Sequence, residues 1–185
     1  EEKLQAVPKE AGILIVTDGV FSMGGDIADL PSIVKLARKY GARVMVDDAH
    51  GLGVIGEGGR GTPSHFGLED QVDIYMGTFS KSLASLGGYM ASAKEVASYV
   101  RHASRPFIFS ASIPPASCAV ALAALRHLES HRELVDHLAD LASYLRNGLK
   151  EKGIPIIEST TPIIPIYTYE VINTLVKAKE LYEEG

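Results

Sequence analysis

Short apolar runs alternate with one amphipathic segment along the first half of the chain. Residues 13–17, 43–47 and 72–78 are compact runs rich in β-branched residues, and each is typical of a buried strand. Between the first two runs, apolar residues recur at helical spacing up to Tyr40, and Gly41 follows as a stop signal. Strand, helix and strand with short links predict a βαβ unit with parallel strands and a right-handed crossover.

The helix of this unit has its own start signal. Asp29 is the better candidate for its N-cap and Asp26 the weaker one, and Pro31 falls in the first turn. Later in the chain, residues 89–92 can form a further short strand, followed by a helix over residues 94–102. The first part of the chain is therefore expected to be an α/β structure.

The pattern changes after two consecutive prolines at 114 and 115. From there the spacing of apolar residues predicts long helices and two short strand-like runs, in the order helix 116–130, helix 132–150, strands 154–157 and 163–167, and helix 171–182. We expect residues 1–130 to be part of a large domain, and residues 131–185 to be the beginning of a smaller α+β domain.

Composition narrows the possible partners. The chain has 185 residues with 46% hydrophobic and 22% charged positions, which is ordinary for a globular protein. Its net charge of -5 and the lack of a Lys/Arg cluster argue against nucleic acid. No apolar stretch is long enough to span a bilayer. Cys118, the single cysteine, rules out an internal disulfide, fits the cytoplasm, and is expected to be packed in the core.

Polar side chains follow each of the three predicted strands. These are Asp18 after the first, Asp47, Asp48 and His50 after the second, and Thr78, Ser80 and Lys81 after the third. Open α/β sheets bind ligands beyond the carboxyl ends of their strands, so these side chains are candidates for one site.

An amine, carboxylates, hydroxyls and an imidazole are the groups that hold pyridoxal phosphate. Lys81 can form a Schiff base with the aldehyde, Asp47 or Asp48 can face the pyridine nitrogen, Thr78 with Ser80 can bind the phosphate, and His50 can manage protons. The same residues allow other interpretations. Asp47, Asp48 and His50 could ligate a metal, but the remaining histidines show no matching cluster, so no metal is expected. The glycine-rich residues 51–61 lack the spacing of a nucleotide-binding loop, which disfavours a nicotinamide cofactor, and we interpret them as a mobile structural loop near the site.

Four ordered motifs resemble a known family. They are Val16-Thr-Asp-Gly-Val-Phe-Ser22-Met-Gly-Gly-Asp26, Val46-Asp-Asp-Ala-His50-Gly-Leu-Gly-Val-Ile-Gly56, Gly77-Thr-Phe-Ser-Lys81-Ser and Phe107-Ile-Phe-Ser-Ala-Ser-Ile-Pro-Pro115. Together they are similar to the α-oxoamine synthases, which include 8-amino-7-oxononanoate synthase, glycine C-acetyltransferase and serine palmitoyltransferase. The segment around Lys81 is closer to the palmitoyltransferases, whereas the segment around His50 is closer to the oxononanoate synthases.

The resemblance implies a fold and a reaction. The fold is the three-layer α/β/α large domain of pyridoxal-phosphate transferases (aminotransferase fold type I), here partial, with the start of the small domain. The implied reaction condenses a small amino acid with an acyl-CoA, releasing CoA and usually carbon dioxide, in a homodimer. A plain aminotransferase, and an inactive piece that only assembles with a partner, are the alternatives.

The resemblance also implies roles for individual positions. Lys81 is the Schiff-base lysine, Asp47 rather than Asp48 pairs with the pyridine nitrogen, and His50 lies near the phenolic oxygen. The other implied cofactor-binding residues are Ser22 beside the same oxygen, Thr78 and Ser80 at the phosphate, and Ser110, or Ala111, at the phosphate of the neighbouring subunit. The family's ring-stacking residue and carboxylate-binding arginine are not found in these 185 residues, so the chain resembles the middle of a longer enzyme.

Overall fold

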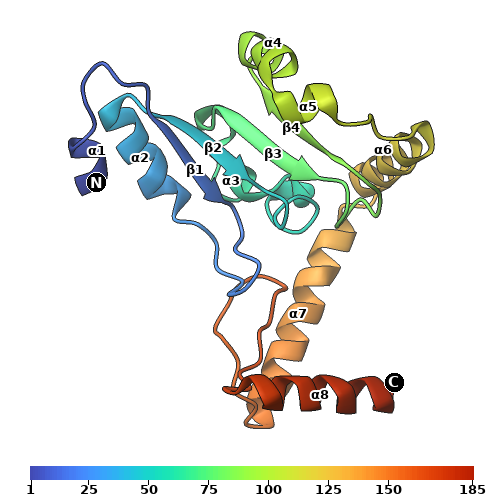
Figure 1. The fold of residues 1–185 in the computed structure, drawn as a ribbon. Coiled ribbons are helices and arrows are strands. Elements are labelled where there is room, and N and C mark those ends of the chain that lie inside the picture. Colours follow the sequence, from blue (N-terminus) through green and yellow to red (C-terminus); the bar gives the residue numbers. More distant parts are fainter.

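The sheet at the centre of the molecule has four strands in the order β1-β2-β3-β4. The computed structural model describes residues 1–185 (Figure 1). The strands are β1 Leu14–Asp18, β2 Arg43–Asp47, β3 Ile74–Thr78 and β4 Gly88–Ser92. The first three are parallel and β4 runs antiparallel to β3, so the sheet is mixed.

The register of the parallel strands aligns their carboxyl ends. Asp18 at the end of β1 is paired with Asp47 at the end of β2, and Asp47 is paired with Met76 of β3. Strand β3 continues two residues further to Thr78. The expected convergence of three strand ends at one edge of the sheet is therefore present.

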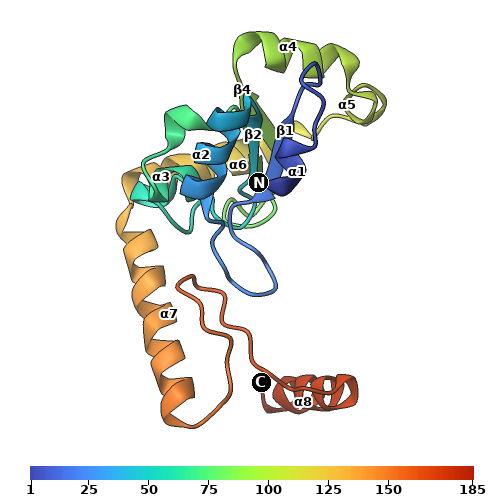
Figure 2. The same ribbon diagram turned by 90° about the vertical axis from the view of Figure 1, so that its left-hand side faces the viewer.

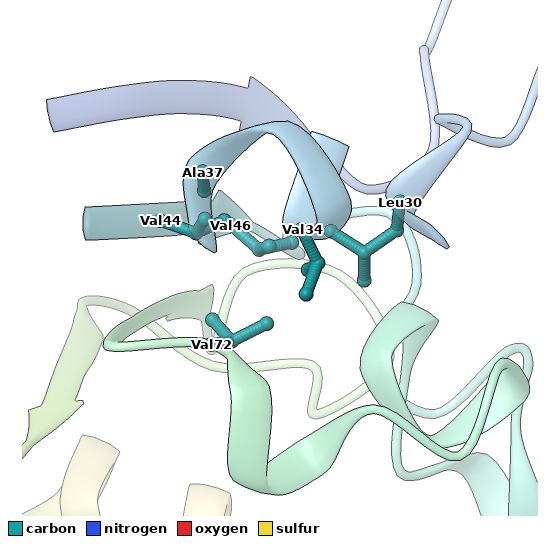
Figure 3. Close-up of a cluster of buried hydrophobic side chains, with 6 residues drawn as sticks. All are labelled: Leu30, Val34, Ala37, Val44, Val46 and Val72. Atoms are coloured by element: carbon teal, nitrogen blue, oxygen red, sulfur yellow. The ribbon is translucent and has the colours of Figure 1, made fainter. Parts of the chain in front are cut away.

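Helix α2 (Leu30–Tyr40) covers one face of the sheet, and its local signals act as predicted. The Asp29 carboxylate accepts a hydrogen bond from the backbone N–H of Ser32, and Gly41 ends the helix at φ 65°. Figure 3 shows the core that the helix forms with the sheet. Its buried members are Leu30, Val34 and Ala37 from the helix, Val44 and Val46 from β2, and Val72.

Helix α4 (Lys94–Ala103) lies on the opposite face. Side chains alternate along β3, so Ile74 and Met76 point away from the α2 core, and they line two open grooves together with Val96 and Val100 of α4. The sheet therefore lies between two helical layers, and the predicted α/β class is confirmed. At β1 this second face is open, since the Val16 side chain is 59% exposed.

The remaining helices are α1 (Glu2–Gln5), α3 (Thr62–His65), α5 (Arg105–Phe109), α6 (Pro115–Ser130), α7 (Glu133–Glu151) and α8 (Val171–Glu184), with 3-10 turns at Glu57–Gly59 and Glu69–Gln71. Helix α7 leads away from the sheet, and the chain after it turns back toward the loop that follows β1 (Figures 1 and 2). The short helices α1, α3 and α5 were not predicted, because four or five residues carry too little periodicity.

The two strands predicted at 154–157 and 163–167 do not form. The structure has only an isolated antiparallel bridge there, between Ile156 and Ile166. Prolines at 155, 162 and 165 supply no N–H, so a continuous ladder cannot be completed. Cys118 is exposed, not packed in the core as expected.

The predicted domain boundary near residue 130 falls at the break between α6 and α7, and it stays a prediction. None of the helices is both long and apolar enough to cross a membrane.

Candidate active site

Asp47 is the last residue of β2, and one of its carboxylate oxygens accepts a hydrogen bond. The backbone N–H of Ala49 donates to its Oδ1 at 3.1 Å, and its other oxygen has no hydrogen-bond partner in the chain. The side chain is partly buried and points to the face of the sheet opposite α2. Asp47 therefore has a free acceptor at the carboxyl edge.

Asp48 has a different environment, although it is the next residue. Its Oδ2 accepts from the backbone N–H of Thr62 at 2.7 Å, and its Oδ1 accepts from the Thr62 hydroxyl at 2.6 Å. Both side chains are buried. Burial raises the pKa of the Asp48 carboxyl above its usual value and the Asp47 charge adds to this, while the two bonds from Thr62 oppose it.

Both oxygens of Asp48 are thus engaged inside the protein. A Cβ added to Gly19, Gly51 or Gly61 would lie within 2.5 Å of one of these oxygens, so three chain segments approach the carboxylate closely. Asp48 thus connects the glycine-rich loop to the end of β2, whereas Asp47 keeps one oxygen without a partner in the chain.

Backbone hydrogen bonds connect the two halves of the glycine-rich loop of residues 51–61. The N–H of Gly53 donates to the carbonyl of Gly59 at 2.7 Å, and the N–H of Gly61 donates to the carbonyl of Ile55 at 2.8 Å. Leu128 and Val135, from α6 and α7, pack against it. The loop lies near the site as expected, and its expected mobility stays a prediction.

The turn after β3 presents Lys81. The hydroxyls of Thr78 and Ser80 lie 2.8 Å apart, and the N–H of Ser80 donates to Thr78 Oγ1 at 3.2 Å. The Thr78 hydroxyl also donates to the carbonyl of Gly87 at 3.1 Å. Lys81 is exposed and makes no hydrogen bond or ion pair, so its amine is accessible on a turn whose hydroxyls are held in place.

A direct hydrogen bond joins this turn to the loop that follows His50. The hydroxyl of Ser82, next to Lys81, donates to the carbonyl of Leu52 at 2.7 Å. Leu52 is two residues after His50, which is partly buried. The predicted amine and imidazole therefore belong to two segments that touch.

Ser22 lies at the tip of a hairpin after β1. The N–H of Gly19 donates to the carbonyl of Asp47 at 2.7 Å, and Val20 then pairs with Ile27. The Ser22 side chain is exposed. The hairpin thus starts beside Asp47, and Ser22 extends from the same edge of the sheet.

Ser110 is a predicted site residue that makes no hydrogen bond to the other predicted site residues. It is exposed, in the segment between α5 and α6, and no hydrogen bond links it to the strand ends. Ile113, three residues later, lies against Gly87 of the Lys81 turn, as the short distance to a Cβ built on Gly87 shows. The segment that carries Ser110 therefore contacts the Lys81 turn through Ile113.

The sequence analysis missed Thr62, which fixes the loop between Asp48 and α3. The only available signal was the doubled aspartate. Consecutive side chains on a strand point in opposite directions, so the two carboxylates could not both face a ligand.

Comparison with known proteins decides the family. The chain matches the aminotransferase class I and II family over residues 1–185. The chain belongs to this family. It is 49% identical over 185 residues to 8-amino-7-oxononanoate synthase of Thermosipho melanesiensis, covering 100% of this chain and 47% of the relative. It is also 49% identical over 183 residues to serine palmitoyltransferase of Sphingobacterium spiritivorum, covering 99% and 46%.

A solved structure agrees with this assignment. Serine palmitoyltransferase from S. paucimobilis, a lysine-to-alanine variant with a bound PLP–myriocin aldimine, superimposes with a TM-score of 0.87 at 39% identity, covering 92% of this chain and 45% of that one. The predicted family and the type I transferase fold are thereby confirmed. The chain spans about half the length of the curated relatives that it matches, and the equal identities do not separate the two kinds of enzyme.

Proposed function

We propose that this aminotransferase-family chain supplies the central part of a pyridoxal-phosphate-dependent acyltransferase that condenses a small amino acid with an acyl-CoA, as α-oxoamine synthases do. The observation that carries the proposal is the strand register. It sets Asp47 beside Met76, two residues before the turn of Thr78, Ser80 and Lys81. The names of the relatives, oxononanoate synthase and serine palmitoyltransferase, support the same reaction class.

The donor set fits pyridoxal phosphate. The cofactor needs an accessible amine, an unoccupied carboxylate oxygen and donors for a phosphate. Lys81 is exposed without a partner, and Asp47 keeps a free oxygen. We assign Lys81 to covalent attachment of the aldehyde and Asp47 to the pyridine nitrogen. Asp48 is not available for that role, because Thr62 engages both of its oxygens.

The hydroxyl and imidazole side chains complete the assignment. The hydroxyls of Thr78 and Ser80 lie 2.8 Å apart in one turn, and we assign both to the phosphate. We assign His50 and Ser22, which follow the ends of β2 and β1, to the cofactor's phenolic oxygen. We assign Ser110 to the phosphate of the neighbouring subunit, since it makes no contact with the strand ends of its own chain.

The chain's own residues then act as follows. When bound, the cofactor supplies an electron sink for the bond broken at the amino acid's α-carbon. Asp47 would accept a hydrogen bond from the protonated ring nitrogen through the oxygen that it keeps free. Lys81 would hold the cofactor covalently, and with the substrate amine in its place its free amine would be able to accept or return a proton. His50 donates a hydrogen bond to the oxygen of the acyl group or carries a proton to it.

The assembly is part of the same proposal. Three apolar side chains beside Ser110 are exposed, namely Phe107 at 63%, Ile108 at 51% and Phe109 at 84%. An exposed apolar patch of this kind is typical of an interface, which supports a homodimer with shared sites. We also assign residues 1–130 to the large domain and residues 131–185 to the start of the small domain, and we expect a cytoplasmic enzyme from the single free cysteine.

A release assay distinguishes this function from the alternatives. The protein in its full natural length should liberate free thiol from an acyl-CoA only when an amino acid is supplied. A plain aminotransferase would instead convert the cofactor to its amine form and require a keto acid. No thiol release and no cofactor exchange, with any pair of small amino acid and acyl-CoA, would favour an inactive assembly module.

A further inference from the structure

Thr161 is the most completely buried polar residue far from the strand ends. Its side chain has no exposed surface, although it lies in the irregular segment between α7 and α8. A hydroxyl is buried in this way only when hydrogen bonds compensate for the lost water. The partners of Thr161 therefore indicate what the segment is built to hold.

The hydroxyl of Thr161 donates to the carbonyl of Gly25 at 2.9 Å, across 136 residues of sequence. The hydroxyl of Ser159 donates to the same carbonyl at 3.0 Å and lies 3.0 Å from the Thr161 hydroxyl. Gly25 belongs to the hairpin whose tip carries Ser22, and its N–H donates to the carbonyl of Phe21 at 2.8 Å. Two hydroxyls from the segment after α7 thus bind the backbone of the hairpin at Gly25.

The approach of the two segments leaves no free space. Gly25 has φ +74°, and a Cβ built on it would lie 2.6 Å from Ser159 Oγ and 2.7 Å from the carbonyl oxygen of Ile163. The hairpin can adopt this contact only with glycine at that position. On the other side, the Arg146 guanidinium of α7 donates to the carbonyl of Thr161 at 2.7 Å. Figures 1 and 2 show the chain after α7 returning to this hairpin.

We propose that Thr161 is a positioning residue, whose hydroxyl fixes the hairpin of residues 20–27 and thereby sets the place of Ser22 at the candidate cofactor site. The role of Ser22 rests on the proposed function, whereas the hold on the hairpin does not. Through Arg146, Thr161 links α7 to a loop that begins beside Asp47. The C-terminal part of the chain thus takes part in shaping the site without contributing a group to it.

The test uses the full-length protein with three variants. Thr161→Val removes the hydroxyl at nearly constant volume, Thr161→Ser keeps it, and Thr160→Val changes the exposed neighbour, which makes no hydrogen bond through its side chain. The first measurement is hydrogen exchange of the amides of residues 20–27 in protein without cofactor. The second is the dissociation constant for pyridoxal phosphate, from an absorbance titration.

Thr161→Val is expected to speed exchange in residues 20–27 and to weaken cofactor binding, each by about fivefold or more, because a buried carbonyl loses a donor. Thr161→Ser should come close to the wild type in both the exchange rate and the dissociation constant, and Thr160→Val should match the wild type. Unchanged exchange in folded Thr161→Val overturns the proposal. If Thr161→Val does not fold, Ser159→Ala takes its place with the same two outcomes.

The two proposals fail in different ways. If the wild type binds no pyridoxal phosphate, the proposed function is wrong, and the exchange measurement still decides the role of Thr161. If cofactor binds but Thr161→Val leaves either the exchange or the dissociation constant unchanged, the function stands and the positioning role is wrong.

Discussion

The carboxylate of Asp48 holds both the N–H and the hydroxyl of Thr62, at 2.7 Å and 2.6 Å. The two residues are 14 positions apart, and the glycine-rich loop lies between them. The pair closes the loop of residues 51–61, which directly follows His50. It therefore supports the candidate site, although both Asp48 oxygens are bonded inside the protein. The neighbouring Asp47 keeps one oxygen without a partner in the chain, and it is the carboxylate that we assign to the cofactor.

Removing the Thr62 hydroxyl should destabilise the fold. In Thr62→Val the buried Asp48 carboxylate loses one of its two donors, which costs about 1–3 kcal/mol of unfolding free energy. Thr62→Ser keeps the hydroxyl and should lose clearly less. Chemical denaturation of both variants measures the difference, and equal stability of Thr62→Val and the wild type would show that the pair is energetically unimportant.

The raised pKa of Asp48 predicts a pH dependence of stability. Burial makes the carboxyl ionise at a higher pH in the folded protein than in the unfolded chain, where its usual value is 3.8. The unfolded chain therefore loses this proton first, and the contribution of Asp48 to stability falls as pH rises from about 3.8 through the raised pKa. In Asp48→Asn the side chain does not ionise, so this contribution to the pH dependence is absent. Denaturation at several pH values measures the unfolding free energy of both proteins. That of the wild type should decline relative to that of Asp48→Asn as pH rises over that interval, and a relative increase would contradict the prediction.

The two aspartates should differ in their effect on the cofactor. Asp47→Asn replaces the carboxylate assigned to the ring nitrogen, and we expect the affinity for pyridoxal phosphate to fall by about tenfold or more, as for loss of a hydrogen bond to a charged group. Asp48→Asn is the matched control and should retain cofactor wherever it folds. An absorbance titration compares them, and a larger loss in Asp48→Asn would exchange the two roles.

The core beneath α2 should dominate local stability. Leu30 is fully buried between the helix and β2, so Leu30→Ala is expected to cost about 2–5 kcal/mol. Lys35→Ala, on the exposed side of the same helix, should change stability by no more than about 0.5 kcal/mol. Thermal and urea unfolding provide the comparison, and similar losses in both variants would place the core elsewhere.

The sequence predicted those parts of the fold that local signals determine. Asp29, Pro31 and Gly41 lie within or beside one helix, so capping and backbone preferences were sufficient to place α2. The strands β1 to β3 were likewise predicted within two residues, because each is a compact run rich in apolar residues. The strand pattern in turn predicted the edge at which Asp47 and the Lys81 turn converge.

Contacts between distant segments could not be predicted in this way. Thr161 meets Gly25 only through the path of the chain after α7, and neither residue carries a local sign of the contact. The prediction of two strands between α7 and α8 was wrong because it followed the apolar pattern, although three prolines in the segment cannot donate backbone hydrogen bonds.

The most direct test of the account is reduction of the pyridoxal-phosphate-loaded, full-length protein with borohydride, followed by mass spectrometry of its peptides. The account predicts that the reduced cofactor is found on the peptide containing Lys81, and that Lys81→Ala yields no labelled peptide although the protein stays folded. A label on another lysine, or labelling that persists in Lys81→Ala, would contradict it.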